Sequence, residues 1–283
     1  MIKETKPNDY PRIYLFGDSL TERARYESDN GFAWKLGEYY DRRVEVVNAG
    51  YSGQTTKSLR KTFEKYIIQV IEKRGPPAPL FISIFLGAND ACLSYTDPYV
   101  PLPEFEEHIR YYVNSIVDHS GTQETKVILI TPPPVDIPSV RMGLVNHLPE
   151  VEGVLKSVAR MGRGHRTWAS KRAFAEKIVE IGKEFERKTD RVAVLDFWTA
   201  VTKFACEEKV PDGGGFDKLD LKERLPGSGM PGATEFGREY FIDGLHFGSK
   251  GYEILTRELF GLLLSKWPEL EKQNFPLRDY HQG

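Results

Sequence analysis

Apolar residues gather in five short runs along the chain, at residues 12–17, 43–50, 80–90, 126–134 and 191–197. These runs are rich in Val, Ile and Phe, and the third and fourth are almost continuously apolar. Continuous apolar runs of this length are typical of strands buried on both faces, as in a parallel sheet. The pattern therefore predicts buried strands at these places.

Segments with a helical period of apolar positions separate and follow the strands, at residues 31–40, 55–74, 102–119, 168–188 and 249–267. In the last segment, Leu255 and Leu259 belong to one apolar stripe, and Pro268 ends the pattern. Strands that alternate with helices predict a doubly wound α/β sheet with right-handed crossovers. Because the chain has no internal repeat and no low-complexity linker, we expect a single domain over residues 1–283.

Two stretches fit neither pattern, and we expect both to be insertions. Residues 132–167 begin with three prolines, and residues 209–241 contain the glycine-rich segments PDGGGF and PGSGMPGATEFG. Both leave from the side of an open α/β sheet where ligands bind, although surface decoration is an equally good interpretation. A tail from about residue 268 has several large apolar residues, which are expected to pack either on its own domain or on a second copy in a homodimer.

Composition narrows the classes of function. The net charge of the chain is -2, so it has no basic surplus that would favour nucleic acid or an anionic membrane as a partner. No apolar run has the length of a membrane span, and the polar N-terminus leaves no room for a signal peptide. Two cysteines, Cys92 and Cys206, are too few for a disulfide framework. These features predict a cytoplasmic protein with reduced thiols and no stable membrane insertion.

The first predicted strand ends in the sequence FGDSL, which places Ser19 at its carboxyl end. Gly-Asp-Ser is also ordinary turn and helix N-cap chemistry. A serine hydroxyl is a poor nucleophile until a base accepts its proton. A catalytic interpretation of Ser19 therefore requires a histidine and a carboxylate that orients the histidine.

Among the six histidines, His246 has a carboxylate at a suitable spacing. It lies in FIDGLHFGSK, just before the last predicted helix and three residues after Asp243. In a turn, this spacing places both side chains on the same side, so that Asp243 accepts the proton of one ring nitrogen and leaves the other nitrogen as the base. The alternative is a helix cap, with Asp243 and Ser249 as candidates.

Acyl transfer also requires hydrogen-bond donors where negative charge develops on the carbonyl oxygen. Gly53, in NAGYSGQT after the second strand, brings a backbone N–H close to a ligand because it has no Cβ. Asn89, in LGAND at the end of the third run, offers a side-chain amide. Since Ser19, Gly53 and Asn89 follow successive strands, we expect them at the same edge of the sheet, beside Asp243 and His246.

Four sequence blocks, FGDSL, NAGYSG, GAND and DGLH, stand in the order and spacing of the GDSL, or SGNH, hydrolase superfamily, which the chain resembles from residue 13 to about residue 264. Within the superfamily, these blocks and the tail FPLRDYHQG are most similar to isoamyl-acetate-hydrolysing esterases. The resemblance implies a flavodoxin-like, three-layer α/β/α fold with a five-stranded parallel sheet. Both insertions are longer than expected for that branch, which leaves the substrate open.

The resemblance further implies a serine esterase that hydrolyses short-chain, acetate-type esters through an acyl-enzyme. Ser19 is then the nucleophile, His246 the base and Asp243 its orienting acid. The backbone N–H groups of Ser19 and Gly53 and the amide of Asn89 then form the oxyanion hole. The implied partner is a small-molecule ester, and no metal or organic cofactor is implied. The alternatives are an acyltransferase or a thioesterase-like or lipase-like hydrolase on the same triad, and a binding module without catalysis.

Overall fold

The computed structural model describes residues 10–94, 97–136, 167–209, 225–228 and 233–277. At its centre lies a five-stranded sheet with the strand order β2-β1-β3-β4-β5, and all neighbouring strands are parallel. The strands are β1 (Arg12–Gly17), β2 (Glu45–Gly50), β3 (Phe81–Phe85), β4 (Lys126–Ile130) and β5 (Val192–Leu195). Each of the predicted runs therefore contains one strand, and the predicted parallel sheet is confirmed.

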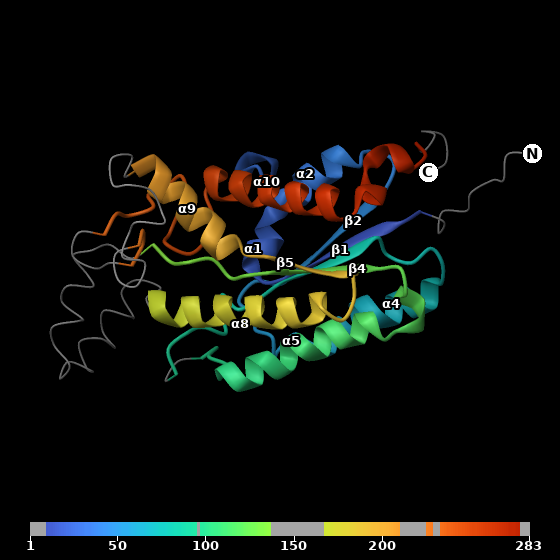
Figure 1. The fold of residues 1–283 in the computed structure, drawn as a ribbon, viewed down its shortest axis with the longest axis horizontal. Helices are drawn as coiled ribbons and strands as arrows, with labels where there is room; N and C mark the ends of the chain where they lie inside the picture. Colours follow the sequence, from blue (N-terminus) through green and yellow to red (C-terminus); the bar gives the residue numbers. More distant parts are fainter. Residues whose placement is uncertain (1–9, 95–96, 137–166, 210–224, 229–232, 278–283) are drawn as a thin grey trace, which may run out of the picture.

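Helices cover both faces of the sheet, which gives the three-layer α/β/α fold that the resemblance implies (Figure 1). The upper layer in Figure 1 contains α1 (Ser19–Glu22), α2 (Phe32–Tyr39), α9 (Phe197–Lys209) and α10 (Ser249–Lys266). The lower layer contains α4 (Gln69–Arg74), α5 (Leu102–Val117) and α8 (Trp168–Glu186). The segments α3 (Arg60–Phe63) and η3 (Glu64–Ile68) lead directly into α4.

The side chains of each strand alternate between the two helical layers, because successive residues of a strand point to opposite faces. In β1, Ile13 and Leu15 pack in the core shared with α2 and α10, whereas Tyr14 and Phe16 pack in the core shared with α5. All four side chains are at most 2% exposed. Burial on both faces likewise explains why β3 and β4 are almost continuously apolar in sequence.

Several predicted elements are shorter in the structure than the sequence suggests, and the difference is largest for one helix and one strand. The predicted helix over residues 55–74 begins only at Arg60, because the side chains of Thr55 and Ser58 bind backbone N–H groups and hold a turn there. The predicted strand over residues 80–90 ends at Phe85, and the residues that follow form a loop and a turn. This turn carries Asn89.

Two α-helices of the described residues lie outside the predicted elements, and each follows a strand almost at once. Helix α1 begins at Ser19, and the Asp18 carboxylate caps it by accepting the N–H of Leu20 at 2.9 Å. The N-cap interpretation of Gly-Asp-Ser is therefore confirmed. Helix α9 begins two residues after β5, and Asp196 accepts the N–H of Thr199 at 3.1 Å in its first turn.

The tail after α10 packs on its own chain over the described residues. Leu270, in the short 3₁₀ segment η6 (Pro268–Leu270), is 3% exposed, and its carbonyl accepts a hydrogen bond from the Tyr40 hydroxyl at 2.6 Å. The ring of Phe275 lies 6.0 Å from the ring of Tyr40. Of the two alternatives for the tail, these contacts support packing on its own chain.

Most of each predicted insertion lies outside the described residues, namely 137–166 of the first and 210–224 and 229–232 of the second. The division into one domain with two insertions therefore stays a prediction. The described ends of the two stretches contact each other, because the Asp136 carboxylate accepts the N–H groups of Phe236 and Gly237 at 2.8 and 2.9 Å. Among the described helices, none combines the length and the apolar character that a membrane crossing requires.

Candidate active site

Four of the five residues predicted at one edge of the sheet line a pocket of about 510 Å³, and Asp243 contacts one of them, His246. Ser19, Gly53 and Asn89 line the pocket after the carboxyl ends of β1, β2 and β3, and His246 lines it from the loop before α10. The other described lining residues are Glu22, Arg23, Arg25, Tyr26, Ser52 and Leu245. The prediction that these side chains lie together on one side of the sheet is therefore confirmed for Ser19, Gly53, Asn89 and His246.

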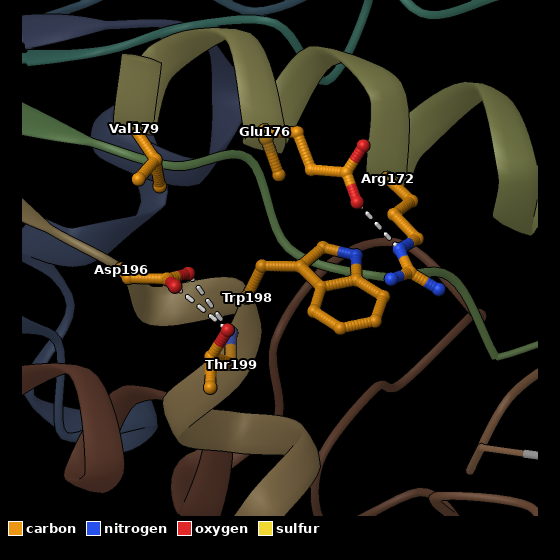
Figure 2. A pocket seen from close by; sticks show the side chains of 7 residues that line it. Arg172, Glu176, Val179, Asp196, Trp198 and Thr199 are labelled. Carbon is orange, nitrogen blue, oxygen red and sulfur yellow. Dashed lines mark hydrogen bonds and ion pairs between the residues drawn. The ribbon is translucent and has the colours of Figure 1, made fainter. Parts of the chain in front are cut away.

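A second, smaller pocket of about 180 Å³ lies between α8 and the start of α9 (Figure 2). Its polar side chains bind one another: Arg172 donates to Glu176 at 2.7 Å, and Thr199 donates to Asp196 at 2.7 Å. The described lining of this pocket contains no serine, cysteine or histidine. Among the described residues, the candidate residues for acyl transfer therefore line the larger pocket.

Ser19 is the first residue of α1, so its position depends on how tightly that helix folds back on β1. Gly17 makes this return feasible, because a Cβ there would lie 2.1 Å from the Thr21 hydroxyl oxygen and 2.6 Å from the Phe85 carbonyl. Ser19 is buried, with 7% of its surface exposed, and it lines the pocket. The capped helix and the position of the candidate nucleophile are thus two results of one local structure.

Ser19, His246 and Asp243 form a continuous hydrogen-bonded chain. The Nε2 atom of His246 lies 2.9 Å from Ser19 Oγ, and the Nδ1 atom lies 2.9 Å from Asp243 Oδ2. The other carboxylate oxygen of Asp243 accepts the backbone N–H groups of Leu245 at 3.1 Å and His246 at 2.9 Å. The helix-cap alternative for Asp243 is wrong, because α10 is capped at Gly248 without a side-chain hydrogen bond.

The environment of Asp243 keeps its carboxyl ionised. Burial is the largest single cause and raises the pKa of Asp243, but the hydrogen bonds from the backbone and ring of His246, the charge of His246 and the N–H of Leu245 together lower it by more. The net pKa lies below the ordinary value for aspartate, so Asp243 remains an anion at neutral pH. An anion at this position favours the ring tautomer with its proton on Nδ1, which leaves the lone pair of Nε2 directed at Ser19.

The two loops predicted to supply oxyanion donors are joined by hydrogen bonds. Asn89 Nδ2 donates to Gln54 O at 2.8 Å, and Thr56 donates its N–H to Asp90 Oδ1 at 2.9 Å. The Thr56 hydroxyl donates to the same Asp90 oxygen at 2.5 Å. Burial raises the pKa of Asp90 to about 6, against the opposing effect of these bonds from Thr56.

The prediction explains Gly53 by the space that a Cβ would fill, but the structure explains it by the backbone conformation. The φ angle of Gly53 is +75°, which glycine adopts without strain, whereas a Cβ at this position would meet no atom within 4 Å. The conformation of the loop, and not a lack of space, therefore explains the glycine.

Glu22 is a pocket residue that the sequence analysis does not single out. It lies one helical turn after Ser19 and accepts the backbone N–H of Ser52 at 2.8 Å and the Ser52 hydroxyl. The bond from the Ser52 hydroxyl is the largest cause of a lowered pKa for Glu22. In the sequence GDSLTE, Glu22 follows Ser19 by three residues, which is one helical turn. This spacing is the one sequence signal for the link between α1 and the Gly53 loop.

Metal ligands do not cluster in the part of the chain that the structure describes: no group of three or more His, Cys, Asp or Glu side chains is placed to hold an ion. The two cysteines, Cys92 and Cys206, are buried free thiols.

Comparison with known proteins places these features in a family. The family model of the GDSL-like lipase/acylhydrolases matches residues 13–259. An isoamyl acetate-hydrolyzing esterase of Saccharomyces cerevisiae is 28% identical over 281 residues, which cover 96% of this chain and 94% of the yeast protein. A GDSL esterase/lipase of Arabidopsis thaliana is 38% identical over 128 residues, 44% of this chain and 51% of the plant protein.

The fold has solved counterparts as well. The crystal structure of a lipase/acylhydrolase from Enterococcus faecalis superimposes with a TM-score of 0.55 at 24% identity, and the match covers 95% of this chain and 99% of that one. The parallel sheet, the pocket at its carboxyl edge and these relatives define a carboxylic ester hydrolase. The chain belongs to the GDSL-like lipase/acylhydrolase family.

Proposed function

We propose that the chain hydrolyses short-chain, acetate-type esters through an acyl-enzyme, with Ser19 as the nucleophile, His246 as the base and Asp243 as its orienting acid. The observation that carries this proposal is the pair of 2.9 Å contacts that joins Ser19 Oγ to Asp243 Oδ2 through both ring nitrogens of His246. A serine activated by an oriented histidine is the requirement for attack on an ester carbonyl.

In the proposed reaction, His246 carries one proton during acylation and one during deacylation. Ser19 Oγ attacks the carbonyl carbon while its proton moves to His246 Nε2, and the carbonyl oxygen becomes an oxyanion. When the C–O bond to the alcohol breaks, the same Nε2 proton passes to the departing oxygen. His246 then takes a proton from water, whose oxygen attacks the acyl-enzyme, and returns that proton to Ser19 when the acid leaves.

The proposed oxyanion donors are the backbone N–H groups of Ser19 and Gly53 and the side chain of Asn89. An amide nitrogen has two hydrogens: the one that points to Gln54 O fixes the plane of the Asn89 amide, and the other is the proposed donor. Donors that are held in place before the substrate binds stabilise developing charge without reorganising at the moment of reaction.

The described lining of the pocket supports a short acyl group. Leu245 is its one aliphatic side chain beside charged and polar residues such as Arg23, Arg25 and Glu22. Each methylene contributes about 0.8 kcal/mol only where it is buried against apolar surface. A long acyl chain gains little against this lining, whereas an acetyl group needs no apolar channel. The yeast relative, whose name specifies isoamyl acetate, agrees with an acetate-type substrate.

We expect kcat/KM to be higher for acetyl and butyryl esters of nitrophenol than for octanoyl and palmitoyl esters. The measurement is the rate of nitrophenol release across this series at fixed enzyme concentration, with and without a chelator. A maximum at palmitoyl would contradict the short-ester proposal and indicate a lipase-like or thioesterase-like member of the family. Ester formation in the presence of an added primary alcohol would indicate an acyltransferase.

Replacing Asn89 by alanine should lower kcat by roughly two to three orders of magnitude and leave KM almost unchanged, because one oxyanion donor is lost in the transition state. Steady-state kinetics with nitrophenyl acetate measure both constants. A variant in which KM rises and kcat is unchanged would identify Asn89 as a contact of the bound ester instead. The melting temperature of the variant controls for loosening of the loop through the lost bond to Gln54.

A further inference from the structure

Lys171, in the first turn of α8, is a charged side chain with no solvent exposure. Its Nζ atom donates a hydrogen bond to the Ala88 carbonyl at 2.7 Å. A buried ammonium is costly unless negative groups and hydrogen-bond acceptors compensate it. Burial raises the pKa of the Asp90 carboxyl and the positive charge of Lys171 opposes that rise, so the two buried charges stabilise each other.

The position of these contacts relative to Asn89 is specific. The Ala88 carbonyl belongs to the planar peptide group that also contains the backbone N–H of Asn89, so a bond to this oxygen fixes the orientation of the peptide entering Asn89. Asp90, the next residue, holds Thr56 through two hydrogen bonds. Lys171 therefore binds one neighbour of Asn89 and balances the charge of the other.

Helix α8 binds the same turn at a second point. The hydroxyl of Ser170 donates to the Ala91 carbonyl at 2.9 Å and also takes part in the capping box of α8 with Thr167. Two successive residues of one helix thus hold the carbonyls on either side of Asn89 and Asp90. On the opposite side, Gln54 binds the Asn89 side chain.

We propose that Lys171 is a positioning residue for ester hydrolysis, whose buried ammonium holds the Ala88 carbonyl beside Asp90 and thereby places Asn89 where the oxyanion forms. The proposal rests on the proposed function, since it gives Asn89 the role of an oxyanion donor. Lys171 acts through the backbone and touches no reacting atom. Its removal is therefore expected to affect the transition state more than the binding of the ester.

The first test is Lys171→Met, which keeps much of the side-chain length and removes the charge and the donor. We expect kcat for nitrophenyl acetate to fall by about 10- to 100-fold with KM within about threefold of the wild type, since small displacements of a catalytic group cost up to about 100-fold. A trifluoromethyl ketone, which forms a tetrahedral adduct with an oxyanion, should bind more weakly by about the same factor as kcat/KM falls. The matched control is Lys183→Met, the same change at an exposed position of α8, which should leave all three constants unchanged.

A second variant separates positioning from stability, because Lys171→Met leaves Asp90 as an unbalanced buried charge. In Lys171→Met/Asp90→Asn both charges are absent and the carboxamide oxygen still accepts from Thr56, so the melting temperature should recover. The kcat of this double variant should stay at least about tenfold below that of Asp90→Asn alone. Equal kcat values in that pair, or a folded Lys171→Met variant with wild-type kcat, would overturn the positioning role.

Failure of the proposed function has a different signature. If the wild type releases no nitrophenol from any ester and Ser19 does not react with a fluorophosphonate, the esterase proposal is wrong and the role of Lys171 falls with it. If the wild type is active and the Lys171 variants are equally active, the esterase proposal stands and the positioning role alone is wrong.

Discussion

Ser19→Ala should fold like the wild type and lose about three to six orders of magnitude in kcat for short esters. The substitution removes the oxygen proposed to form the acyl-enzyme. It leaves the backbone of α1 intact, because the Asp18 cap binds the N–H of Leu20 and not the Ser19 side chain. The backbone donors proposed for the oxyanion hole also remain. Initial rates with nitrophenyl acetate, measured at enzyme concentrations high enough to detect the residual activity, give the size of the loss.

The control for Ser19→Ala is Ser265→Ala, a serine on the exposed side of α10, prepared in the same way to reveal contaminating esterases. A fluorophosphonate should label the wild type and the Ser265 variant and should not label Ser19→Ala. Wild-type turnover by Ser19→Ala, with the contaminant control clean, would falsify the triad assignment. Labelling of the wild type would exclude the alternative of a binding module that has lost its nucleophile.

Asp243→Asn should lower kcat by about four orders of magnitude through the wrong histidine tautomer. The backbone N–H groups of Leu245 and His246 require an acceptor at Oδ1, so the asparagine oxygen is expected to take that place. Its NH₂ group then faces Nδ1 of His246, where Asp243 now accepts, and Nδ1 has to become the acceptor. The ring proton moves to Nε2, which leaves His246 without a lone pair for the proton of Ser19.

The measurement for Asp243→Asn is kcat together with the melting temperature, and Asp243→Ala is the matched comparison. Alanine removes the acceptor for both backbone N–H groups as well, so it should lower the melting temperature, whereas asparagine should not. If Asp243→Asn retained kcat within about tenfold of the wild type, Asp243 would be a structural brace of the loop and not part of the proton transfer.

The sheet and the position of the site were accessible from sequence because each depends on a local signal. Each strand lies within a short apolar run, and β1, β3 and β4 are almost entirely buried. A serine, a glycine and an asparagine follow three of these runs. The parallel arrangement then places the carboxyl ends of the strands at one edge of the sheet, and this placement does not depend on the conformation of the loops. Asp243 and His246 are near neighbours in sequence, so their contact is also local.

The features that could not be predicted from the sequence depend on contacts between distant segments, or on an abrupt change from the strand pattern to the helical pattern of apolar residues. Helix α9 begins with Phe197 and Trp198, which continue the apolar run of β5, so the change from strand to helix is hidden within one run. A lysine in a helix is normally a solvent-exposed residue. Lys171 is buried because the start of α8 lies against a turn that is 83 positions away in sequence, a proximity that no local pattern records.

The proposed nucleophile and its proposed base lie 227 positions apart in the chain. Ser19 belongs to the first strand and helix, and His246 stands immediately before the last long helix. A contact between segments so far apart forms only after the chain between them has found its place, and such non-local contacts are the slow ones in folding. With the proposed triad, catalytic competence is therefore a property of the completed fold: a growing chain that has already formed β1, β2 and β3 carries Ser19 without its proposed base, and hydrolysis is expected only once the loop before α10 has docked.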